Sequence, residues 1–113
     1  MSTAAKELPA CPVETTLTLI CDKWKVLILR DLMPGTKRSG ELKKSIGTVS
    51  QKVLTAQLRQ MEESGLLTRK VYPEVPPRVE YTLTELGYSL KPILDAMGNW
   101  GEAYKARSGQ DRA

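Results

Sequence analysis

The stretch that decides the fold is 39–83, which reads SGELKKSIGTVSQKVLTAQLRQMEESGLLTRKVYPEVPPRVEYTL. Ser50 is a candidate N-cap for a helix that runs to about Ser64, and Gly65 is a candidate C-cap that stops it. Its predicted inner stripe has apolar residues at helical spacing, namely Leu54, Leu58 and Met61. A shorter helix over 40–46, capped by Ser39, is predicted just before it.

Two helices joined by a short turn that contains glycine, here Gly47, are typical of a helix-turn-helix. A predicted β-hairpin follows, because 66–72 is rich in β-branched and aromatic residues and 78–83 alternates polar and apolar residues. The loop 73–77 between them carries three prolines, which stiffen the tip. The hairpin predicts a wing beside the helix pair.

Helices are also predicted on both sides of this stretch. One spans 12–21 and starts at Pro12, and a second begins after the cap Asp22 and ends at Pro34-Gly35. A last helix is predicted over 84–107, with Thr84 as its candidate N-cap and a kink at Pro92. The fold class is therefore mainly α with a small β-hairpin wing, a winged helix-turn-helix.

The domain organisation follows from the same pattern. We expect a flexible N-terminal arm over 1–10, one folded domain over 11–107 and a flexible tail over 108–113. The chain of 113 residues has the length of one domain.

Composition excludes several kinds of chemistry. The sequence has no histidine and two cysteines, so we expect no His-based catalysis, no zinc site of the usual N/S type and no other metal or cofactor. No carboxylate or lysine acid–base constellation suggests an enzyme. No apolar run is long enough to span a membrane and no secretory signal is evident, so the expected location is cytoplasmic, with reduced thiols.

Positive charge is concentrated in the middle of the chain. The net charge is +4 overall, and segment 22–80 carries +5 while the two ends together carry −1. A basic centre is typical of a polyanion-binding surface, although a solvated surface rich in lysine explains the charge equally well.

The outer face of the helix over 50–64 suits the DNA major groove. Its candidate DNA-binding residues are Ser50, Gln51, Lys52, Thr55 and Arg59. Arg and Lys pair with guanine and Gln with adenine, and the N-terminal turn enters the groove first. The alternative is an ordinary amphipathic helix with a polar outer side.

Basic residues around this helix extend the candidate surface. Arg78, placed at the wing tip, would reach the adjacent minor groove, unless it is simply paired with Glu74 or Glu80. Phosphate contacts are expected from Lys37, Arg38, Lys43 and Lys44. The alternative for these four is simple solubility.

Several motifs together make the chain resemble HxlR-type winged-helix transcriptional regulators, a MarR-like family. They are Cys11-Pro12-Val13-Glu14, Lys23-Trp24, Ser50-Gln51-Lys52-Val53-Leu54-Thr55 and Pro76-Pro77-Arg78-Val79-Glu80-Tyr81, within a match over about 11–104. The resemblance implies a bacterial homodimer that binds double-stranded DNA, held together by the helices over 12–21 and 84–107. The residues expected at that interface are Val13, Leu17, Leu90, Leu94, Met97, Trp100 and Tyr104.

The resemblance also implies that Cys11 is a candidate redox sensor, since some members sense electrophiles or oxidants at this position. Cys11 precedes a helix N-terminus, where the helix dipole favours thiolate. Cys21 lies ten residues further on, about 15 Å along one helix, which is too far for a disulfide within it. A buried inert cysteine is the alternative for each.

The sequence departs from the family pattern at two places. Cys21-Asp22 stands where the family usually has glycines, and Ser39 stands where it usually has an aromatic residue. The predicted function is a homodimeric regulator of a pseudo-palindromic operator, modulated through Cys11 or by a small-molecule inducer. The alternative is a winged-helix protein-interaction module without specific DNA binding.

Overall fold

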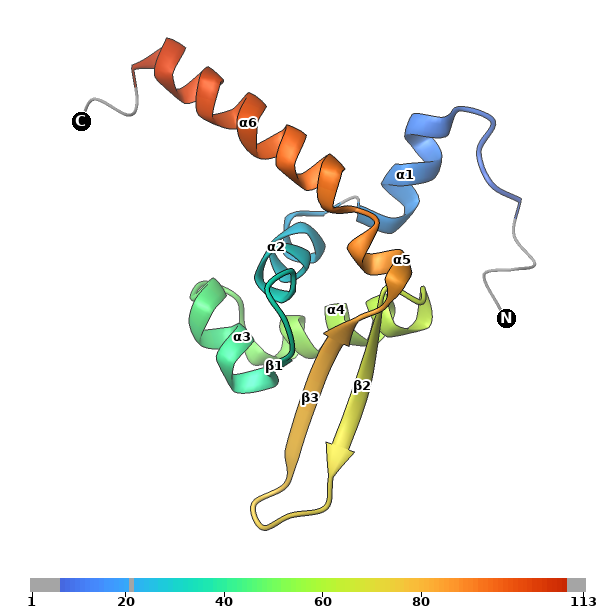
Figure 1. The fold of residues 1–113 in the computed structure, drawn as a ribbon, viewed down its shortest axis with the longest axis vertical. Helices are drawn as coiled ribbons and strands as arrows, with labels where there is room; N and C mark the ends of the chain where they lie inside the picture. Colours follow the sequence, from blue (N-terminus) through green and yellow to red (C-terminus); the bar gives the residue numbers. More distant parts are fainter. Residues whose placement is uncertain (1–6, 21, 110–113) are drawn as a thin grey trace.

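A computed structural model describes residues 7–20 and 22–109. Figure 1 shows a mainly helical body from which a two-stranded wing projects. The elements in chain order are α1 (Pro12–Ile20), α2 (Lys23–Leu32), β1 (Lys37–Arg38), α3 (Ser39–Ile46), α4 (Gln51–Glu63), β2 (Leu67–Tyr72), β3 (Arg78–Leu83), α5 (Glu85–Tyr88) and α6 (Lys91–Ser108). The predicted winged helix-turn-helix is confirmed. Cys21, residues 1–6 of the predicted arm and residues 110–113 of the predicted tail lie outside the described residues.

The wing belongs to a three-stranded antiparallel sheet in the order β1-β3-β2. In β2 and β3, Leu67 pairs with Leu83 at the base and Tyr72 pairs with Arg78 near the tip. On the other side of β3, Lys37 of β1 pairs with Tyr81. The sequence analysis did not predict β1, because a strand of two residues is too short to show alternation.

The core lies where α2, α3, α4 and the base of the sheet meet (Figure 1). Its fully buried side chains are Ile28, Leu29, Leu32, Leu42, Leu54, Leu58, Met61, Leu66 and Leu67. The predicted inner stripe of α4 is therefore confirmed. Burial of this apolar surface supplies most of the stability of such a domain.

Most of the predicted caps are present. The side chains of Asp22, Ser50 and Thr84 accept hydrogen bonds from backbone N–H groups in the first turns of α2, α4 and α5. Gly65 has a φ of 83°, a left-handed conformation that glycine adopts without strain. These caps fix where the helices start and where α4 ends.

The predicted cap at Ser39 is wrong. The N-cap of α3 is Arg38, and Ser39 is already helical. Pairing of β1 with β3 holds Arg38 extended, and its N–H donates to the Glu41 carboxylate at 2.8 Å. In that bond the carboxylate of the third helical residue accepts the N–H of the N-cap residue, one half of a capping box, so α3 starts at Arg38.

The prediction of one kinked helix over 84–107 is also wrong. The segment forms two helices, α5 and α6, and Pro92 lies in the first turn of α6. A proline there costs no hydrogen bond, so it starts a helix instead of bending one. Gly87 allows α5 to pack closely against Leu66, because a Cβ at this position would collide with the Leu66 carbonyl oxygen.

Beyond the body, α6 extends away from the end that carries the wing (Figure 1). Leu90, just before α6, is buried, and Leu94 packs against the core. Further along the helix, Met97, Trp100 and Tyr104 are exposed. Within the described part of the chain, no helix has the length and apolar character needed to cross a membrane.

Candidate nucleic-acid interface

Helix α4 presents a polar face to solvent beside the wing. Ser50 caps it by accepting the N–H of Val53 at 3.1 Å. Gln51, Lys52, Thr55 and Arg59 are all exposed, opposite the buried stripe. The Gln51 side-chain amide donates to the Thr55 hydroxyl at 3.1 Å, which orients both groups on the outer surface.

A buried lysine joins α4 to the start of α2. Lys25 is 8% exposed, and its ammonium group contacts Asp22 Oδ2 at 3.0 Å. The same Nζ donates to Gln57 Oε1 and Gln60 Oε1, both on α4 and both at 2.7 Å. All three ammonium protons therefore have acceptors, which offsets the cost of burying the charge.

The sequence analysis missed Lys25, although a signal was present. Lys25 occupies the same helical stripe as Ile28, Leu29 and Leu32, at spacings of three, four and seven residues. A lysine on an otherwise buried stripe needs a partner. The two glutamines are far away in sequence, so periodicity alone does not identify them.

Asp22 has a dual role at this junction. Its carboxylate caps α2 by accepting the Lys25 N–H at 3.0 Å, and it also contacts the Lys25 ammonium group. Partial burial raises the pKa of Asp22, but the hydrogen bonds from Lys25 outweigh it, so that the pKa lies below its usual value. The carboxylate is therefore charged at neutral pH and holds Lys25 in place.

The wing residue Arg78 has several partners within the protomer. Its guanidinium carbon lies 4.0 Å from the centre of the Tyr72 ring. Its nitrogens lie 3.3 Å from a Glu74 carboxylate oxygen and 3.5 Å from one of Glu80. The pairing that the sequence analysis offered as the alternative is thus present in the protein without DNA.

Arg78 begins β3 and does not occupy the tip, as the sequence analysis had placed it. The exposed loop beyond it includes Val75, which is fully exposed. Nε of Arg78 is buried and has no hydrogen-bond partner within the described residues. A hollow of about 390 Å³ separates this part of the wing from Arg38 and the start of α3.

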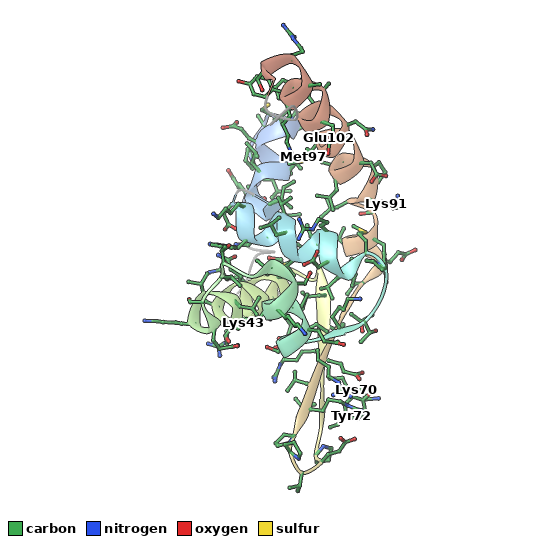
Figure 2. All side chains as sticks on the ribbon, turned by 90° about the vertical axis from the view of Figure 1, so that its left-hand side faces the viewer. Lys43, Lys70, Tyr72, Lys91, Met97 and Glu102 are labelled. Atoms are coloured by element: carbon green, nitrogen blue, oxygen red, sulfur yellow. The ribbon has the colours of Figure 1, made fainter. Side chains whose placement is uncertain are left out.

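The four predicted phosphate contacts lie on β1 and α3. Lys37 and Lys43 are half-buried, whereas Arg38 and Lys44 are exposed. Figure 2 shows Lys43 on the lower half of the molecule, where Lys70 and Tyr72 of the wing also lie, and Met97 and Glu102 on the helix at the other end. Basic side chains of α3 and the wing therefore share one end of the protomer.

A polar contact of Asp31 on α2 also holds helix α3. Asp31 accepts from the Ser45 hydroxyl at 2.7 Å and from Arg30 Nε at 2.8 Å. Burial raises the pKa of Asp31, and the hydrogen bonds from Arg30 and Ser45 lower it further than burial raises it. The net effect is a pKa below the usual value, so the contact persists at neutral pH.

Helices α1 and α6 each carry exposed apolar side chains. Val13 and Leu17 lie on α1, and Met97, Trp100 and Tyr104 lie on α6. The Trp100 and Tyr104 rings stack with their centres 5.4 Å apart. Trp100 is 69% exposed, an unusual position for so large an apolar side chain in a lone protomer.

Cys11 immediately precedes α1. It is free and exposed, and its carbonyl oxygen accepts the Thr15 N–H at 3.0 Å. Cys21, for which a role in packing was the alternative, lies outside the described residues. Across the described residues, no three Cys, Asp or Glu side chains form a group that could hold a metal ion.

Comparisons with known proteins agree with this architecture. A family model described as HxlR-like helix-turn-helix matches residues 19–109. The HTH-type transcriptional regulator YdeP of Bacillus subtilis (strain 168) is 46% identical over 104 residues, which are 92% of this chain and 81% of that protein.

Two solved structures are similar in both fold and sequence. The redox regulator HypR in its oxidized form has a TM-score of 0.77 and 45% identity, covering 82% of this chain and 96% of that one. Diamide-treated YodB from B. subtilis has a TM-score of 0.68 and 37% identity, covering 83% and 94%.

Substitution Lys25→Met should destabilise the protein by about 1–3 kcal/mol, because it leaves Asp22 Oδ2 and the Oε1 atoms of Gln57 and Gln60 without their donor. Urea unfolding followed by circular dichroism measures the change. The matched control is Lys44→Met, which makes the same substitution at an exposed position of α3 and should change stability by less than about 0.5 kcal/mol. Equal stability of the two variants would contradict the anchoring role of Lys25.

Proposed function

Because this chain belongs to the HxlR-like helix-turn-helix family, we propose that this DNA-binding transcriptional regulator acts as a homodimer on a pseudo-palindromic operator. The observation that carries the proposal is the division of the protomer into two ends. One end has basic side chains on α3, α4 and the wing, and the other has exposed apolar side chains on α6. The protein is a regulator and not an enzyme.

The proposed dimer interface uses the apolar surface of α1 and α6. A second copy would cover Val13 and Leu17 together with Met97, Trp100 and Tyr104, all of which are exposed in one protomer. Leu90 and Leu94, also expected there, already pack against the core and would support the interface from beneath. Burial of these side chains favours association through the hydrophobic effect.

In the proposed complex, α4 enters the major groove. Gln51, Lys52, Thr55 and Arg59 face the base edges and the groove walls, because their side chains are exposed on one face. Ser50 uses its oxygen as a cap acceptor, which leaves its hydroxyl proton free to bond a phosphate. Lys37, Arg38, Lys43 and Lys44 contact phosphates on either side.

The wing would enter the neighbouring minor groove. Arg78 would have to exchange Glu74 and Glu80 for the negative potential of the groove. Its pairs are longer than the 2.7–2.9 Å typical of strong charge-assisted hydrogen bonds, so little is lost in the exchange. The aromatic ring of Tyr72 would keep the guanidinium group positioned.

We further propose that thiol modification of Cys11 regulates DNA binding. Cys11 is exposed and adjoins α1, part of the proposed interface. HypR is described as a redox regulator, and YodB was crystallised after diamide treatment. A change at Cys11 would alter how the two protomers meet, and so the distance between their α4 helices. A small molecule bound between the subunits would act through the same interface.

Substitution Trp100→Asp should convert the dimer to a monomer, because a charge at the centre of an apolar interface is costly. Sedimentation equilibrium measures the mass. The affinity for a duplex with both half-sites should fall on the order of 100-fold, because a monomer binds only one half-site at a time. Val75→Asp, at a fully exposed wing residue, is the control and should remain dimeric. A wild-type protein of single-chain mass would refute the dimer.

Substitution Lys52→Ala should weaken binding to the preferred sequence by about 1–3 kcal/mol and relax specificity, whereas Arg78→Ala should weaken binding less selectively. The duplex is one enriched from a random library by the protein itself, and fluorescence anisotropy at several salt concentrations gives the affinities. The half-sites should lie about 34 Å apart. A library that yields no two-fold related sequence, or binding without salt dependence, contradicts the proposal.

Diamide treatment should release the enriched duplex from the wild-type protein and from Cys21→Ser, but not from Cys11→Ser. In the reaction two thiols form one disulfide and give two hydrogens to diamide, which is reduced to the hydrazine. Mass spectrometry identifies the modified cysteine while anisotropy follows DNA release. If Cys11→Ser releases DNA as readily as the wild-type protein, Cys11 is not the sensor.

A further inference from the structure

A small polar hollow lies in the angle between α4 and the wing. It has a volume of about 150 Å³ and is lined by Thr55, Arg59 and Glu62 of α4, Arg69 of β2 and Tyr81 of β3. The three α4 residues follow one another at spacings of four and three, so they share one face of the helix. Arg69 and Tyr81 are paired across the two strands.

The hollow carries net positive charge. Arg59 and Arg69 contribute two charges, and Glu62 cancels one of them. Arg69 Nε lies 3.6 Å from Glu62 Oε1, and the two side chains are 46% and 40% exposed. An exposed pair at this distance is weak, so Arg69 is available to a stronger anion.

Tyr81, which lines the hollow, has a side chain that stays uncharged at neutral pH. Tyr81 is 8% exposed, and burial raises the pKa of its phenol, against the opposing effect of Arg69 and Arg59. The phenol therefore keeps its proton at neutral pH and does not repel an anion. The volume corresponds to about five water molecules at the ~30 Å³ that each occupies in the liquid, which is room for a phosphate group.

The position of the hollow suggests which anion it holds. This step rests on the proposed function, in which α4 occupies the major groove and the wing the neighbouring minor groove. The sugar-phosphate backbone that separates the two grooves must then pass between α4 and the wing. The residues lining the hollow come from both of these elements.

We infer that the hollow is a seat for one phosphate of that backbone, with Arg69 as its principal charged partner. Arg69 acts beside Arg59, and Glu62 is the counter-ion that Arg69 leaves when DNA binds. The contact fixes how deeply α4 enters the groove and carries no base specificity, because a phosphate is the same in every sequence. Arg69 is absent from the set of DNA contacts that the sequence analysis identified.

The first test compares Arg69→Gln with Arg107→Gln, which removes the same charge at the end of α6, far from the wing (Figure 1). For Arg69→Gln, the slope of log affinity against log salt should decrease by about one, with the order of preference among duplexes unchanged. Arg107→Gln should keep the wild-type slope. Arg69→Lys should restore most of the slope, which separates loss of charge from loss of structure.

The second test locates the phosphate. Neutral methylphosphonates are placed one at a time along the enriched duplex. Among the positions at which a methylphosphonate weakens binding of the wild-type protein, one in each half-site should have no further effect on the affinity of Arg69→Gln. Glu62→Gln should tighten binding about three- to tenfold, and that gain should vanish in the double variant Glu62→Gln/Arg69→Gln.

The outcomes separate this inference from the proposed function. If the wild-type protein shows no salt-dependent, sequence-selective binding to any duplex, the proposed function fails, and this inference fails with it. If the wild-type protein binds, but Arg69→Gln behaves as Arg107→Gln and no methylphosphonate loses its effect in Arg69→Gln, the proposed function stands and the phosphate seat is refuted.

Discussion

The placement of α4 depends on the hydrogen bonds that the Lys25 ammonium group donates to it. Apolar packing of Leu54, Leu58 and Met61 buries the inner face of the helix, but such packing is not directional and permits small shifts along the helix axis. Hydrogen bonds to Gln57 and Gln60 at 2.7 Å add direction, because they fix two successive turns of α4 against one point on α2. The orientation of the exposed face of α4 is therefore fixed by contacts on the opposite side of the helix.

The same contact links the two ends of the protomer. Asp22 holds Lys25 from the α1–α2 junction, and Gln57 and Gln60 hold it from α4. The junction adjoins the helix that carries Val13 and Leu17, whereas α4 belongs to the basic end with the wing. The Lys25 side chain thus connects the N-cap of α2 with α4 through hydrogen bonds.

Much of the fold could be predicted because its determinants are local. The inner stripe of α4, the caps Asp22, Ser50 and Thr84, and the alternation in β3 each appear within a few residues of sequence. The division of the last segment into α5 and α6 was missed because a proline that starts a helix and one that bends it look alike in sequence. The structure distinguishes them, because α5 ends at Tyr88 and Pro92 lies in the first turn of the separate helix α6.

The candidate site was less predictable because its determinants are distant in sequence. The exposed residues of α4 followed from helical spacing, but the two glutamine partners of Lys25 lie 32 and 35 residues away from it. The hollow that includes Arg69 needs α4, β2 and β3 to come together. Separately, strand β1, which carries Lys37 and Arg38, is too short to show a pattern in the sequence. Arg78 was identified as a wing residue, but its contact with the Tyr72 ring depends on the register of the hairpin.

The anchoring of α6 at one end has a mechanical consequence. Its 18 residues form an unbroken rod about 27 Å long; Leu90 just before it is buried in the core, and Leu94 in its first turns packs against the core. A tilt of about 5° at that pivot moves the far end by about 2 Å. Such a rod amplifies small angular changes at the body into displacements as large as the tolerance of a close-packed contact, and it transmits forces applied at its tip back to the body with the same leverage.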